Sequence, residues 1–154
     1  MTKEWNFEWQ SYLFVFGVVA LFVLPVYNVA DYKYKFYIEN IVSITVFLSF
    51  TKYIFLLKYS PFARIKWLKF SIVFLCIPLM MYLIGALYDF QKFLDEEGIA
   101  SVLVHTSDMA NYNFGKFIRY QFMFFTTGAI VVTALMPIRM IISFWRTYNT
   151  PDKV

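Results

Sequence analysis

Residues 12–27 read YLFVFGVVALFVLPVY, an apolar run without one charged residue. With its flanks it makes a segment from about Ser11 to Asn28, which approaches the roughly 20 residues that a helix needs to cross about 30 Å of hydrocarbon. Because lipid offers no water to a spanning backbone, such a segment is expected to be helical. The stretch therefore predicts a transmembrane helix.

Three further windows of this kind follow, at about residues 36–57, 67–88 and 117–145. Their connections are short and polar, except for one longer, acidic segment at residues 90–116. Gly98 is expected to end any helix that opens this loop, and Asn113 is a candidate cap for the last helix. The pattern predicts an all-α integral membrane protein: a single domain over residues 1–154, folded as an antiparallel four-transmembrane-helix bundle with one longer extracytoplasmic loop.

The composition supports this class of protein. Of the 154 residues, 60% are hydrophobic, 23% are aromatic and only 16% are charged, which is far from the balance of a soluble domain. The lipid bilayer is thus the first expected partner. The net charge of +4 is scattered along the chain and forms no dense basic stripe, so nucleic acid is not an expected partner.

Lysines and arginines predict the orientation. Eight lie on the side of the second connection and the chain ends: Lys3, Lys58, Arg64, Lys66, Lys69, Arg139, Arg146 and Lys153. Five lie on the opposite side: Lys33, Lys35, Lys92, Lys116 and Arg119. The positive-inside rule then places both termini in the cytoplasm, and the absence of glycosylation sequons and lipidation motifs fits a bacterial inner membrane.

The first span has an alternative interpretation as a signal peptide cleaved near Val29-Ala30. The preceding region, MTKEWNFEW, is acidic as well as basic, and the apolar run exceeds a usual signal-peptide core. We therefore expect the span to be retained.

The second span carries the polar residues that are hardest to place in lipid. Glu39 lies about one turn inside one end, where water or a pairing lysine, Lys33 or Lys35, is expected to satisfy it. Thr45, Ser49 and Lys52 follow at spacings of four and three, which puts them on one helical face. We expect this face to mediate helix packing and the Lys52 stem to extend toward the headgroups.

Three further charged residues near span ends are candidate interfacial or intramembrane sites: Asp89, Arg119 and Arg139. The last span also contains Thr126-Thr127-Gly128, whose small residues allow close helix approach, and Pro137, which allows a bend. With Glu39 and Lys52, these three charges make up the polar path that a transporter would need.

No catalytic, cofactor-binding or metal-binding residues are predicted. The sequence contains no phosphate loop, dinucleotide fingerprint, nucleophile elbow or Cys-x-x-Cys motif. His105 with Asp108 offers too few ligands for a metal, and Cys76 has no second cysteine with which to pair. An enzyme is therefore not expected.

These observations favour a non-catalytic accessory or structural subunit of a larger inner-membrane complex, with other integral membrane subunits as partners. Respiratory complexes, proton-driven motors and secretion machines are candidate hosts. The faces of the second and last spans and the acidic loop are the expected contact surfaces. The alternative is a small transporter or ion-conducting homo-oligomer, and a small membrane enzyme comes third.

Overall fold

The structure is a computed structural model that describes all residues except 1, 31–32, 58–59, 61–64, 104–107 and 150–154. The described part contains four long helices: α1 (Thr2–Val29), α2 (Tyr37–Leu56), α3 (Lys66–Glu96) and α4 (Asp108–Asn149). A short 3-10 helix, η3 (Ile99–Val102), lies between α3 and α4. All four long helices are long and apolar enough to cross a membrane. This confirms the prediction of an all-helical, multi-pass membrane protein.

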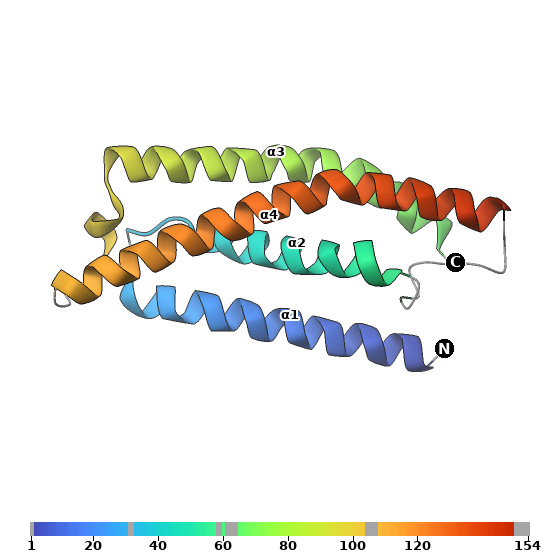
Figure 1. The fold of residues 1–154 in the computed structure, drawn as a ribbon, viewed down its shortest axis with the longest axis horizontal. Coiled ribbons are helices and arrows are strands. Elements are labelled where there is room, and N and C mark those ends of the chain that lie inside the picture. Colours follow the sequence, from blue (N-terminus) through green and yellow to red (C-terminus); the bar gives the residue numbers. More distant parts are fainter. Residues whose placement is uncertain (1, 31–32, 58–59, 61–64, 104–107, 150–154) are drawn as a thin grey trace.

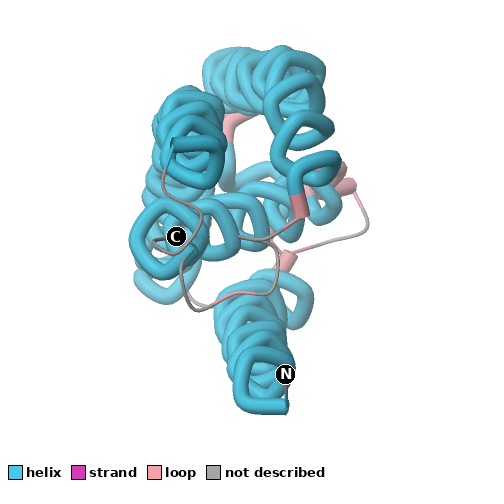
Figure 2. Tube along the Cα trace, turned by 90° about the vertical axis from the view of Figure 1, so that its right-hand side faces the viewer, coloured by secondary structure: helices cyan, strands magenta, loops and turns pink. Residues whose placement is uncertain are grey.

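Consecutive helices run in opposite directions, so the start of α1 and the end of α4 lie at one end of the molecule (Figure 1). We call this the terminal end and the opposite end, which carries η3, the loop end. The parallel pair α2 and α4 makes the most extensive helix contact. α1 packs mainly on α2, and α3 packs mainly on α4. Figure 2 looks at the terminal end and shows α1, marked N, at the edge of the bundle.

Three helices, α1, α3 and α4, extend well beyond their predicted spans, and the last two take up most of the predicted loop at 90–116. α3 continues to Glu96 because Phe90 is fully buried, with its ring centroid 4.0 Å from that of Phe122 on α4. Gly98 follows with a φ of 72°, a left-handed conformation that favours glycine, and the helix has ended before it, as expected. α4 begins at Asp108, so Asn113 lies inside the helix and does not cap it.

The loop end closes on an aromatic and aliphatic core. Its buried residues are Val26, Ala30, Tyr34, Phe90, Val102, Ile118 and Phe122. Ala30 and Leu103 form an antiparallel bridge, which ties the connection after α1 to the segment after η3. Gly115 on α4 permits this packing, because a Cβ there would lie 2.8 Å from Cγ2 of Ile99.

Much of the apolar surface remains exposed, as a bilayer protein requires. Examples are Leu13 and Phe16 on α1, Ile84 on α3 and Ile141 on α4, each more than half exposed. Three prolines lie inside helices, Pro25 in α1, Pro78 in α3 and Pro137 in α4.

Candidate functional site

The strongest polar contact joins α1 to α2 near the terminal end. The Lys52 ammonium lies 2.5 Å from Oε2 of Glu8, and the Tyr53 hydroxyl donates to the same oxygen at 3.4 Å. The hydroxyls of Tyr12 and Tyr53 lie 3.0 Å apart. Because Glu8 is only 2% exposed, its carboxylate is neutralised by Lys52 out of reach of bulk water. We call Glu8, Tyr12, Lys52 and Tyr53 the Glu8 cluster.

Sequence reasoning missed Glu8 because it began the first span at about residue 11, whereas α1 begins at Thr2. A usable signal was present, since Glu8 and Tyr12 stand four residues apart and share a helical face. The expected path of Lys52 also differs. Its ammonium turns toward α1 and lies 4.9 Å from the ring centroid of Tyr12 on α1 and 4.4 Å from that of Tyr53 on α2.

Neutral side chains join α2 to α4. The Thr126 hydroxyl donates to that of Ser43 at 3.0 Å, and Nε2 of Gln121 donates to Oδ1 of Asn40 at 3.3 Å; all four residues are buried. These bonds shield polar groups from lipid and fix the register of the two helices.

The hydroxyl of α2 that bonds to α4 belongs to a residue outside the predicted polar face. Thr45 and Ser49 are half-buried, whereas Ser43, which was not singled out from the sequence, is the fully buried hydroxyl that contacts α4. Lys52, on the same predicted face, contacts α1.

Arg139 on α4 caps the end of α2. Its Nε donates to the backbone carbonyl of Ile54 at 2.8 Å. The last carbonyls of a helix have no intrahelical partner and carry the negative end of its dipole, so a guanidinium is a favourable neighbour there. Arg139 therefore stabilises a helix end within the chain.

The loop end holds a second set of buried polar groups. Glu39 lies in the first turn of α2, where the helix dipole favours a negative charge. Among the described residues, neither Lys33 nor Lys35 pairs with it, and its Oε2 is buried without a hydrogen-bond partner. Burial raises the pKa of the nearby Tyr34 hydroxyl, and Tyr37 and Glu39 raise it further, so Tyr34 stays neutral.

The remaining two predicted residues are exposed. Asp89 lines a shallow cavity of about 210 Å³ with Lys33, Lys35 and Lys92. Arg119 lies on the α4 surface facing the surroundings. The structure thus does not bring Glu39, Lys52, Asp89, Arg119 and Arg139 together into one site.

The charges instead mark two levels of the molecule. Arg139 follows Arg119 by 20 residues, and Asp89 follows Lys69 by 20, which is about 30 Å of helix in each case and matches the hydrocarbon thickness. α2 is itself 20 residues long, with Glu39 in its first turn and Lys52 close to its end. Between these levels the four helices carry hydroxyl and amide groups but no charge.

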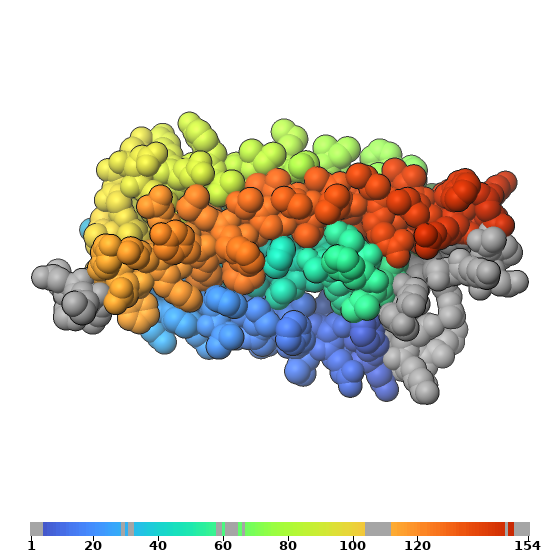
Figure 3. Space-filling view, in the orientation of Figure 1, coloured from blue at the N-terminus to red at the C-terminus, as the bar shows by residue number. Residues whose placement is uncertain are grey.

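One face of the α2–α4 pair is hollowed. A groove of about 730 Å³ runs along α4 and is bordered by Phe47 of α2. Its α4 residues are Arg119, Tyr120, Met123, Phe124, Thr127, Gly128, Val131 and Val132. Figure 3 shows that α4 lies on the open surface of this side of the molecule. We call this feature the α4 groove.

Within the described residues there is no group of three or more His, Cys, Asp and Glu side chains that could hold a metal ion. His105 lies outside the described residues, and Cys76 is buried in α3. Comparison of the chain with protein-family models, curated proteins and solved structures finds no match.

Proposed function

We propose that the chain is a non-catalytic subunit of a larger membrane assembly, which it joins through the α4 groove. The assembly is placed in the bacterial inner membrane, with both termini cytoplasmic and the loop end outside. Hosts of the respiratory, proton-driven motor and secretion types all fit this role.

The use of the polar side chains supports a structural role. Lys52 pairs with Glu8, Ser43 accepts a hydrogen bond from Thr126, and Arg139 donates to a carbonyl at the end of α2. Each contact holds two helices of this chain together. A transporter would direct such groups into a hydrated passage near the middle of the membrane, where these helices carry no charge.

The α4 groove is the observation on which the proposal rests. Three exposed side chains of the groove recur at spacings of four and seven residues along one side of α4: Tyr120, Phe124 and Val131. Gly128 lets the Phe47 ring of α2, which borders the groove, lie close to α4. A transmembrane helix of another subunit fits this surface, because packing against small and aromatic residues drives helix association in lipid.

The charge at the loop end of the groove indicates which kind of partner can bind there. Arg119 is exposed and lies where the uncharged stretch of α4 begins. A second copy in the same orientation would bring two arginines together at this level, which disfavours a symmetric dimer through the groove. A different subunit with a carboxylate at this level would pair with Arg119.

Extraction of the natively expressed, tagged protein in mild detergent tests the proposal. We expect stoichiometric recovery with larger membrane proteins by sizing and mass spectrometry. Val131→Trp, which blocks the groove, should release those proteins, whereas Ile84→Trp on the exposed face of α3 should retain them. Recovery of the wild-type chain alone would contradict the proposal.

Glu39 is the observation that favours the alternative, a small transporter or ion-conducting oligomer. One oxygen of its carboxylate is buried without a hydrogen-bond partner in the described part of the chain, and intramembrane carboxylates commonly handle protons or ions. Reconstitution in liposomes with a pH-sensitive dye tests it: a proton flux that Glu39→Gln abolishes, with assembly intact, would favour transport.

A further inference from the structure

A pocket lies between α1 and α2 beside the Glu8 cluster. Its volume is about 380 Å³, at the lower end of the roughly 300–1,000 Å³ of small-molecule sites. It is lined by Phe7, Gln10, Ser11, Phe14, Val15, Leu48, Thr51, Lys52 and Leu56. Gln10 and Phe14 are exposed, so the pocket opens to the surroundings of the helices.

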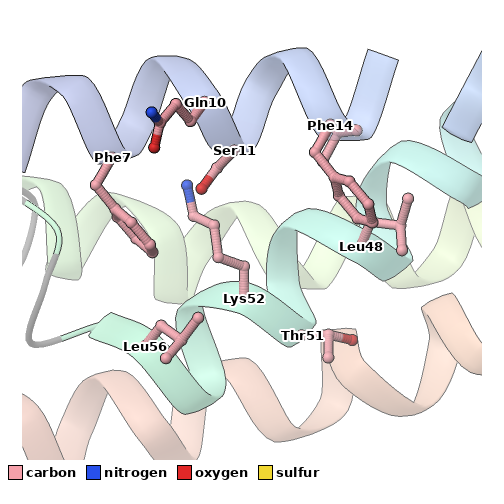
Figure 4. A pocket seen from close by; sticks show the side chains of 9 residues that line it. Phe7, Gln10, Ser11, Phe14, Leu48, Thr51, Lys52 and Leu56 are labelled. Atoms are coloured by element: carbon pink, nitrogen blue, oxygen red, sulfur yellow. The ribbon is translucent and has the colours of Figure 1, made fainter. Parts of the chain in front are cut away.

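Two of the polar groups of the pocket lie side by side. Lys52 extends from α2 toward α1, and its nitrogen lies beside the side chain of Ser11 (Figure 4). An ammonium carries three N–H donors, and in the described part of the chain Glu8 is its one hydrogen-bond acceptor. Lys52 thus has donor capacity left for a ligand.

The charge balance selects an uncharged ligand. The Lys52 charge is already neutralised by Glu8, so an anionic headgroup would have to compete with a buried carboxylate. No acidic residue lines the pocket, so a cationic head has no counter-charge there. An uncharged acceptor, such as a carbonyl oxygen, can bind without breaking the Glu8–Lys52 pair and without a counter-charge in the pocket.

The walls favour a flat ring. Phe7 and Phe14 both point from α1 toward α2, one on each side of Ser11 and the Lys52 nitrogen (Figure 4). They are seven residues apart, or about 10 Å along the helix. Aromatic side chains at this separation offer stacking and edge contacts to a planar head between them, while Val15 and Leu48 continue the apolar surface for a tail.

We propose that this pocket binds the head of a membrane-dissolved quinone, with Lys52 and Ser11 donating hydrogen bonds to a ring carbonyl and the tail lying along Val15 and Leu48. The inference goes beyond the proposed subunit role and does not depend on it, because the site belongs to this chain alone. It concerns binding and implies no electron transfer.

The test uses the purified full-length chain in lipid nanodiscs, irradiated with an azidoquinone that carries a short alkyl tail. Peptide mass spectrometry should place saturable adducts in residues 7–15 and 48–56, and excess decylubiquinone should remove them. Leu48→Trp, which fills the pocket, should abolish the saturable labelling. Ile84→Trp introduces the same side chain on the exposed face of α3 and should leave labelling unchanged.

A milder variant guards against loss of folding. Ser11→Ala keeps the Glu8 cluster and should weaken competition by decylubiquinone about fivefold, the effect of one hydrogen bond. Labelling spread evenly over the apolar surface, or labelling that Leu48→Trp leaves intact, would overturn the proposal. So would a phospholipid that native mass spectrometry finds retained by the wild type, lost in Leu48→Trp and not displaced by decylubiquinone.

Discussion

The interface between α2 and α4 differs in kind from the interface between α1 and α2. The first is close and has no ion pair among the described residues: Ser43 bonds to Thr126, and Gly128 lets the Phe47 ring lie against the α4 backbone. The second depends on one ion pair near the terminal end, Glu8 with Lys52, beside a pocket of about 380 Å³. α2 and α4 therefore form the rigid centre, and α1 is a more loosely packed arm.

This difference shows two ways in which a membrane protein joins helices without a hydrophobic driving force between them. Small residues and hydroxyls give many weak contacts along a helix, so no single one is decisive. An ion pair gives one strong contact whose failure leaves an unpaired charge in an apolar setting. Substitutions in the two interfaces should therefore differ in how much stability they remove and in whether a second substitution restores it.

The largest effect is expected at Glu8. Glu8→Ala leaves the Lys52 ammonium without its carboxylate and should lower the free energy of unfolding by about 3–5 kcal/mol. Because the pair lies between α1 and α2, α1 should also become the helix most sensitive to added protease. Denaturant titration of the detergent-solubilised protein and timed proteolysis measure the two effects.

The matched control removes the pair as a unit. Glu8→Gln combined with Lys52→Met leaves no buried charge, so most of the lost stability should return. A double variant as unstable as Glu8→Ala alone would show that charge burial is not the cause.

The next effect is expected at Gly128. A Cβ there would lie 2.8 Å from two atoms of the Phe47 ring, so Gly128→Val should cost about 1–3 kcal/mol by overpacking. Gly17→Val on α1 is the control, because nothing lies within 4 Å of a Cβ at that position. Adding Phe47→Leu to Gly128→Val should recover part of the loss. Equal melting temperatures for the two valine variants would contradict the closer packing of the α2–α4 centre relative to the α1 arm.

A smaller effect is expected for the hydroxyl pair. Ser43→Ala and Thr126→Ala each remove one side of a hydrogen bond, and a double-mutant cycle should give a coupling of about 0.6 kcal/mol, as is typical for such bonds in membranes. A coupling above about 3 kcal/mol would mean that one contact dominates the α2–α4 interface as well.

The smallest effect is expected at Glu39. Glu39→Gln removes the charge but keeps the size and polarity of the side chain, so stability should change by less than about 0.5 kcal/mol, and copurifying proteins should remain. A loss of more than about 2 kcal/mol would show that the loop end also depends on a buried charge.

Four spans could be predicted because each is long and predominantly apolar, and those features decide membrane insertion without tertiary information. The helix ends were harder to predict. α3 runs on to Glu96 because Phe90 finds an aromatic partner on α4, which is a tertiary contact that local sequence does not contain. α4 likewise begins at Asp108, before the predicted start at about residue 117.

The sequence predicts which kinds of polar residue make contacts between helices, but not which residues pair with one another. Helical periodicity indicates that Thr45, Ser49 and Lys52 share a face, but it does not say which neighbour that face meets. In the structure Lys52 meets α1 and Ser43 meets α4. Glu8 was missed because the residues before the apolar run carry both acidic and basic side chains, which is typical of a solvated tail. Glu8 is recognised as part of the first helix only when that helix is extended toward the N-terminus.

Crosslinking in the native membrane tests the central claim, that the chain is a subunit which docks a partner helix in the α4 groove. A photoreactive amino acid is placed at Thr127 in the groove and, as a control, at Leu21 on the exposed face of α1. The account predicts one discrete heavier adduct from Thr127, containing a different membrane protein, and none of that size from Leu21. Adducts from both positions alike, or from Thr127 with a second copy of this chain, would contradict it.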